Sequence, residues 1–146
     1  MLVTQKNQYA LRAIFELAKY RGQGPIKIYE IAEAQNIPLR FLEVILSRLK
    51  RSGLVESKRG YTGGYRLIRD PMEITVADIF RFMDESLGPI ECVACVSEKS
   101  NCPYQGQCAF FPMWQKVQDA IRDVFDKTTI HDLLEVNNSE GVHCCI

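Results

Sequence analysis

Apolar residues recur at helical spacing through the first third of the chain. One set follows i, i+3, i+4, i+7 and i+8 and predicts an amphipathic helix over about 7–20: Ala10, Ala13, Ile14, Leu17 and Ala18. Thr4 precedes this set and is its candidate N-cap. Ile28, Ile31 and Ala32 predict a short second helix, and Pro38 suits the start of a third helix after a brief turn.

The third helix, over 38–52, has two different faces. When Arg40 is placed at zero and each residue advances about 100°, the apolar side chains occupy one arc: Phe41, Leu42, Ile45, Leu46 and Leu49. Polar and mostly basic residues occupy the opposite arc: Arg40, Glu43, Ser47, Arg48, Lys50 and Arg51. The pattern predicts one face in the core and one face free to meet a partner.

Two short strands, over 54–58 and 65–69, are expected next. The connection between them contains three glycines and begins with Arg59, which predicts a hairpin with a flexible basic tip. A fourth helix follows over about 75–84. The order of three helices and a hairpin predicts a winged helix-turn-helix, so the fold class is mainly α with a small β-wing.

The second half of the chain is less regular. Residues 85–111 read as a cysteine-rich sensor loop, because glycines and prolines interrupt any apolar period there. A dimerisation helix and a short following helix are expected over 112–136, with a flexible tail over 137–146. The first of these helices carries an apolar stripe: Met113, Trp114, Val117, Ile121, Val124 and Phe125. Residues 1–84 form the predicted DNA-binding domain.

Charge separates the two halves. The 146 residues contain 18 Lys and Arg and 18 Asp and Glu, so the net charge is zero. Residues 1–81 nevertheless carry 14 basic against 8 acidic residues, a balance of +6, and the rest carry 4 against 10, a balance of −6. The basic excess over 40–69 indicates a polyanionic partner. No apolar run has membrane-spanning length, and Arg12 and Glu16 interrupt the only stretch resembling a secretion signal, so we expect a cytoplasmic protein without membrane contact.

The polar face of the third helix is suited to double-stranded DNA, because a major groove admits one helix. Arg40, at its N-terminal end, can donate to guanine O6 and N7, and Glu43 can accept from cytosine N4. Ser47 lies between them and the C-terminal end, where Lys50 and Arg51 are better placed for phosphates. Together these are the predicted base and backbone contacts of the helix.

The wing supplies the remaining predicted DNA-binding residues, Arg59 and Tyr61. Narrow A·T-rich minor grooves attract arginine, which suits Arg59 at the tip. Plain solvent exposure is the alternative for any single cation, and it is favoured for Arg66 and Arg69.

Four cysteines follow a C-x2-C-x6-C-x5-C spacing: Cys92, Cys95, Cys102 and Cys108. Without a secretion signal, metal or redox chemistry is favoured over a disulfide framework. Thiolates suit iron–sulfur clusters, zinc and copper(I), and an iron–sulfur cluster fits this uneven spacing better than zinc, which normally has two tight pairs. Free thiols or a regulatory disulfide are the alternatives, and Cys144 and Cys145 read as tail thiols.

These features resemble the Rrf2 family of transcription regulators, which includes IscR-like and NsrR-like iron–sulfur regulators. The resemblance covers about residues 1–136. It rests on YALRA at 9–13, FLE at 41–43, GLV at 53–55, and the wing signature S-x-R-G-x-x-G-G-Y-x-L at 57–67. It implies a homodimer held by helix 112–126, bound to a roughly palindromic operator, and a sensory cluster bound just before that helix.

The resemblance also implies which cysteines are ligands. Cys102, Cys108 and Trp114 have the family's spacing, and Cys92 matches the first ligand, although its gap to Cys102 is longer. The family has two alternative positions for the fourth ligand. In this sequence they are occupied by Phe111 and Gln8, and neither residue is of the usual ligand type. Cys95, an exogenous group or a partner-subunit group then completes the site, and the cluster is [2Fe–2S] or [4Fe–4S].

The leading hypothesis is a DNA-binding regulator that senses redox state, nitric oxide or iron–sulfur status through this cluster. The second hypothesis is the same regulator without a cluster, which responds by thiol oxidation or through a partner protein. A small metal-binding or electron-transfer module is a third, and the basic winged helix argues against it. No nucleotide-binding glycine motif or nucleophile with a recognisable histidine partner is present, so no enzyme is expected.

Overall fold

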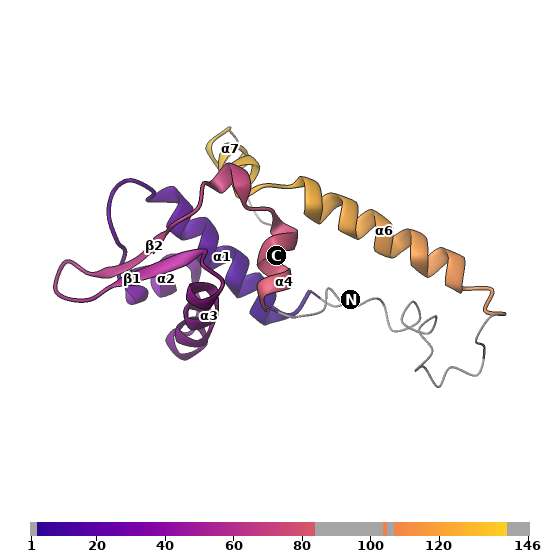
Figure 1. Ribbon diagram of the computed structural model, residues 1–146, viewed down its shortest axis with the longest axis horizontal. Coiled ribbons are helices and arrows are strands. Elements are labelled where there is room, and N and C mark those ends of the chain that lie inside the picture. Colours follow the sequence, from indigo (N-terminus) through magenta and orange to yellow (C-terminus); the bar gives the residue numbers. More distant parts are fainter. Residues whose placement is uncertain (1–2, 84–103, 105–106, 140–146) are drawn as a thin grey trace.

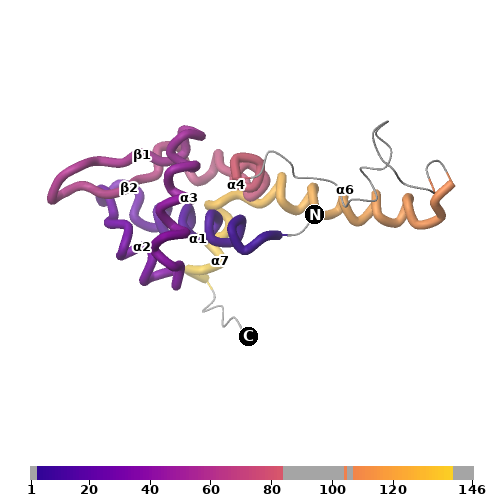
Figure 2. The backbone as a smooth tube through the Cα atoms, turned by 90° about the horizontal axis from the view of Figure 1, so that it is seen from below, coloured from indigo at the N-terminus to yellow at the C-terminus, as the bar shows by residue number. Residues whose placement is uncertain are grey.

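The computed structural model describes residues 3–83, 104 and 107–139. It is mainly helical, with one two-stranded antiparallel sheet. Figure 1 shows a compact body with the hairpin at one end and a long helix, α6, extending from the other end, and Figure 2 shows the same arrangement from a second direction. In the described ranges no helix is both long enough and apolar enough to cross a membrane.

Helix α1 (Gln5–Lys19) crosses the centre of the body. Its predicted cap is confirmed, because the Oγ of Thr4 accepts from the backbone N–H of Asn7 at 3.2 Å. The predicted apolar face is buried: Ala10, Ala13, Ile14, Leu17 and Ala18. α1 therefore forms the central support on which the other helices of the body pack.

Helices α2 (Ile28–Gln35) and α3 (Leu39–Arg51) form the predicted helix-turn-helix. Asn36 ends α2 in the left-handed conformation with φ of 50°, and Ile37 is buried in the turn. Gly53 follows α3 with φ of 76°, a conformation that a glycine adopts without strain. The turn thus presents α3 on the outside of the body.

One residue of the predicted α3 core is misassigned. Leu42, Ile45, Leu46 and Leu49 are buried as expected, whereas Phe41 is 61% exposed. The core arc is narrower than predicted, at about 140° to 240° from Arg40, and Phe41 falls outside it at about 100°. Its ring instead lies against Tyr9, with ring centroids 6.4 Å apart.

The wing consists of β1 (Val55–Lys58) and β2 (Gly64–Leu67), paired from Val55 with Leu67 to Lys58 with Gly64. Ile26, in the connection before α2, adds two hydrogen bonds to Tyr65, of 2.8 and 2.7 Å. A Cβ at Gly64 would overlap the backbone carbonyl of Ile26. Gly64 therefore allows close backbone contact between the wing and Ile26, whereas a Cβ at Gly63 would overlap the Lys58 carbonyl within the wing itself.

A short 3-10 helix, η1 (Pro71–Glu73), and helix α4 (Val76–Met83) complete the body. In the C-terminal part, α6 (Phe111–Lys127) is followed by α7 (Ile130–Ser139). α7 extends beyond the predicted end at Val136, and the hydroxyl of Ser139 donates to the Glu135 carbonyl at 2.8 Å in its last turn. The first three residues of the predicted tail are therefore helical.

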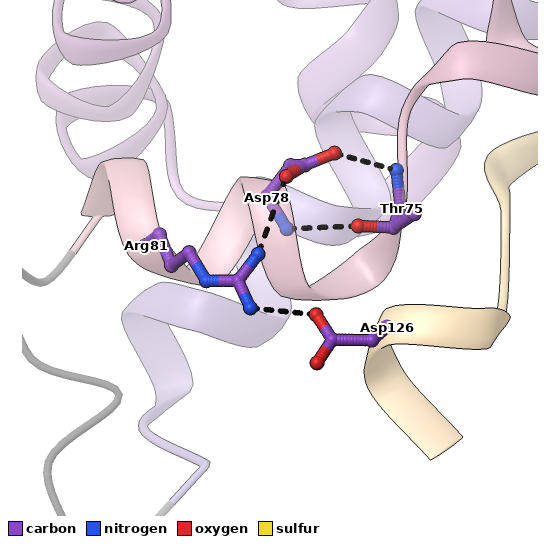
Figure 3. Close-up of polar contacts among 4 residues, drawn as sticks. All are labelled: Thr75, Asp78, Arg81 and Asp126. Carbon is purple, nitrogen blue, oxygen red and sulfur yellow. Dashed lines mark hydrogen bonds and ion pairs between the residues drawn. The ribbon is translucent and has the colours of Figure 1, made fainter. Parts of the chain in front are cut away.

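The base of α6 is attached to the body at several points. Thr75 and Thr129 form an antiparallel bridge, with a 3.0 Å hydrogen bond from Val76 N–H to the Thr128 carbonyl. Arg81 of α4 bonds both Asp78, at 3.5 Å, and Asp126 of α6, at 2.6 Å (Figure 3).

Aromatic packing and helix capping strengthen this junction. The rings of Phe80 and Phe125 meet edge to face at 5.1 Å. Thr129 and Asp132 cap α7 reciprocally. Hydrogen bonding to the Asp132 carboxyl by the backbone N–H of Thr129, and next by its side chain, holds the pKa of that carboxyl below its usual value. The direction in which α6 leaves the body is thus determined by contacts at its C-terminal end.

Candidate DNA interface and cysteine segment

The DNA-contact residues predicted for α3 lie together on the outer face of this helix. Arg40, Glu43, Ser47, Lys50 and Arg51 are all exposed on this helix. Neither Arg40 nor Glu43 forms an ion pair with any residue that the structure describes. Their charges are therefore available to a ligand in front of the helix.

The C-terminal end of α3 is held toward the wing. The Nζ of Lys50 donates to the hydroxyl of Ser57 on β1 at 2.6 Å. Arg48, Lys50 and Arg51 all lie in the last turn, where the helix dipole favours positive charge. This end presents cations suited to phosphate, and their position also stabilises the helix.

The wing tip is highly exposed. Tyr61 is 98% exposed, and Arg59 forms no ion pair with a described residue. The Nζ of Lys27 donates to the carbonyl of Gly60 at 3.2 Å, which ties the tip to the start of α2. Arg66 differs, because its guanidinium pairs with Glu56 on the neighbouring strand. The charge of Arg66 is therefore partly compensated within the wing, unlike that of Arg59.

Sequence reasoning missed two features of α3. Arg48 was grouped with the free polar arc, but its guanidinium donates to the Met83 carbonyl at the end of α4, at 2.8 Å. Lys6 of α1 donates to the same carbonyl at 3.2 Å. No local pattern predicts this contact, because it depends on how α4 packs beside α3. The second missed residue is Val44, which is 56% exposed on the outer face.

Only part of the predicted cysteine site is described. Cys108 is a free, half-buried thiol just before α6, and its carbonyl accepts from the N–H of Phe111 at 3.2 Å. Cys92, Cys95 and Cys102 lie outside the described residues, as do Cys144 and Cys145. Among residues 3–83, 104 and 107–139, no group of three or more His, Cys, Asp and Glu is placed to hold a metal ion.

The α6 stripe is largely uncovered in the single chain. Phe125 packs on Phe80, but Met113, Val117 and Val124 are 47%, 40% and 58% exposed. Trp114 and Ile121 are half-buried. The stripe therefore continues beyond the body as an apolar surface on an otherwise charged helix.

Fold and surface together define a winged helix-turn-helix DNA-binding protein. Residues 3–136 match the Rrf2 family, described as an iron-dependent transcriptional regulator. The chain belongs to the Rrf2 family of transcription regulators, as its wing signature predicted.

Individual relatives agree with this assignment. The chain is 34% identical over 140 residues to the HTH-type transcriptional regulator CymR of Bacillus subtilis, covering 96% of this chain and 94% of that protein. Among solved structures, IscR of T. potens is 32% identical with a TM-score of 0.74, covering all of this chain and 93% of that one. The structure of B. subtilis CymR, titled the global cysteine regulator, is 34% identical with a TM-score of 0.75, covering 92% and 97%. These relatives are transcription regulators and not enzymes.

Proposed function

We propose that this protein is a homodimeric regulator that binds a roughly palindromic operator and senses its signal through the cysteine segment. The observation that carries the DNA-binding part is the exposed face of α3, where Arg40 and Glu43 have no ion pair with a described residue, beside an exposed basic wing tip. Arg40 and Glu43 contact base edges in the major groove, and Ser47 hydrogen-bonds beside them. Lys50 and Arg51 contact phosphates.

The wing contacts the same DNA on its neighbouring groove. Arg59 enters an A·T-rich minor groove, where the negative potential is strongest. The phenol of Tyr61, which is almost fully exposed, donates to the backbone beside it. The tether from Lys27 to Gly60 supports this role, because it restricts where the tip lies before DNA binds.

The dimer forms through α6. Exposed apolar side chains along this helix are explained when a second copy covers them, and a two-fold dimer buries the same stripe on both chains. Such a dimer places its two α3 helices on successive major grooves of one duplex, which is why the operator is expected to be palindromic. The contacts of Arg81 with Asp126 and of Phe80 with Phe125 join the proposed dimer helix to the DNA-binding body.

An iron–sulfur cluster is the proposed sensor. Cys92, Cys102 and Cys108 would hold it, with Cys95 as the candidate fourth ligand, because thiolates are the ligands that such clusters require. When bound, the cluster supplies an inorganic centre that responds to oxidants, nitric oxide or iron supply. Cys108 lies three residues before α6, so its state bears directly on the start of the proposed dimer helix.

A cluster-free regulator is the second candidate. Cys108 is a half-buried free thiol, and Phe111 and Gln8 occupy the positions of the family's fourth ligands. The similarity to a regulator titled for cysteine is as strong as that to IscR. In this version the cysteines respond by oxidation, or a partner protein supplies the signal.

Anaerobic purification and reconstitution decide between the two. Visible absorbance with bound iron and sulfide supports the cluster, whereas a colourless, iron-free protein supports the second candidate. Replacing Cys92, Cys102 or Cys108 by Ala should abolish the cluster, and Cys144→Ala and Cys145→Ala are the matched controls. Cys95→Ala should change the spectrum only if Cys95 is the fourth ligand. A full cluster in the Cys102 or Cys108 variant contradicts the ligand assignment.

A further inference from the structure

Val44 is an apolar residue in the middle of the polar face of α3. The buried residues of this helix centre on about 190° from Arg40, so the outward direction is about 10°. Val44 lies at about 40° and Ser47 at about 340°, one on each side of that direction. Val44 is 56% exposed, so the body leaves more than half of this residue uncovered.

The other exposed apolar residues of α3 differ from Val44 in position. Phe41 lies at the edge of the face and contacts the Tyr9 ring. Leu39 is the first residue of the helix and lies at about 260°, toward the buried side. Val44 alone among these three is flanked on the outer face by Arg40 one turn before it and by Ser47 and Arg51 after it.

The isopropyl group of Val44 faces the same ligand as Arg40 and Glu43. Of the base edges in a major groove, only thymine presents an apolar group, its 5-methyl. Arg40 before Val44 and Arg51 after it are exposed cations on the same face. Their attraction to the DNA draws the helix close, so water is excluded from the valine between them. We infer that Val44 is a specificity residue of the proposed DNA interface and packs against the 5-methyl group of one thymine in each half-site. This inference rests on the proposed DNA binding.

The size of the effect follows from the area involved. Burying one methyl-sized group contributes a free energy that corresponds to about a fourfold change in affinity per half-site. If another residue contacts a thymine, removal of that thymine's methyl lowers the affinity equally with or without the Val44 side chain. A contact made by Val44 is therefore recognised when the affinity depends on the thymine methyl in the unchanged protein and no longer does so in a variant without the valine side chain.

The experiment uses the full-length protein and a deoxyuridine scan. A duplex is first selected from a random pool by the protein, and each thymine is then replaced by deoxyuridine, which removes only the 5-methyl. For the unchanged protein, one thymine per half-site should show about a fourfold loss of affinity. Val44→Ala should bind less tightly to the thymine duplex and show no further loss at that position. Val44→Thr, which keeps one methyl, should show an intermediate loss.

Val136→Ala is the matched control, because Val136 is 50% exposed on α7, away from α3. It should retain the full deoxyuridine effect. An equal deoxyuridine loss in Val44→Ala, or no sensitive thymine in either half-site, overturns the inference while leaving DNA binding intact. If no duplex is enriched from the pool, the proposed function itself fails, and the inference fails with it.

Discussion

The winged-helix body and the α6–α7 arm differ in how far they bury their apolar residues. In the described chain, every buried apolar residue except Ile130 lies within 10–83, and α6 contributes none. The body carries 14 basic against 8 acidic residues over 3–83, a balance of +6. Residues 107–139 carry 3 against 5, a balance of −2. The body thus buries its apolar residues within one chain and carries the basic excess, whereas the arm leaves an apolar stripe exposed.

The largest expected effect is in the body core. Leu46→Ala removes a fully buried side chain of α3 and should lower the free energy of unfolding by about 2–5 kcal/mol. The loss should be the same at every protein concentration, because the residue packs within one chain. Chemical denaturation followed by circular dichroism measures it. A strongly concentration-dependent loss would mean that the body is not stable by itself.

The arm should behave in the opposite way. Val117→Lys places a charge in the α6 stripe and should raise the dimer dissociation constant at least about tenfold, since a charge must be desolvated at the interface. Size-exclusion chromatography with light scattering at micromolar concentration is the measurement. Gln115→Lys is the control, because Gln115 is exposed on α6 at about 140° from the centre of the stripe. If the protein without substitutions is a monomer at this concentration, the proposed dimer is contradicted.

Removal of cations from the body should affect DNA binding without affecting assembly. Arg59→Ala should cost about 1–3 kcal/mol, chiefly at A·T-rich flanks, and Lys50→Ala should weaken binding by a similar factor for all sequences. Fluorescence anisotropy titrations against matched duplexes separate the two patterns. Arg66→Ala serves as control, since Arg66 pairs with Glu56. Unchanged affinity in both test variants removes the model of helix and wing contacts.

The smallest effect is expected where the two regions meet. Arg81 and Asp126 are about half exposed, at 50% and 45%, so their coupling energy should be about 0.2–1 kcal/mol and should fall with added salt. A double-mutant cycle with Arg81→Ala and Asp126→Ala measures it by denaturation. The pair Asp123 and Lys127, within α6, is the comparison pair. If the coupling energy between Arg81 and Asp126 is zero at low salt, the ion pair does not stabilise the junction, and the stabilisation is assigned to the contact of Phe80 with Phe125.

Local patterns were sufficient for most of the body. The order of helices and wing, the cap at Thr4 and the outer position of Arg40 and Glu43 all follow from periodicity and turn residues, which act over a few neighbouring positions. The same reasoning placed Phe41 in the core, because residues at the border of an apolar arc are assigned by their type alone. Which border residue is covered depends on the neighbouring helix, and here Tyr9 covers Phe41 only in part.

By itself, the sequence determined the helix-turn-helix with its basic wing, the charge separation of the two halves and the set of candidate thiolates. Only the tertiary structure decided how these parts are attached. It paired Ile26 with Tyr65, placed Arg48 on the Met83 carbonyl and attached the base of α6 through Arg81. Such contacts join residues that are tens of positions apart, and they depend on the final packing of whole elements. A local sequence pattern does not predict that packing. Val44 was therefore recognised as an outward-facing residue only from the buried residues of α3.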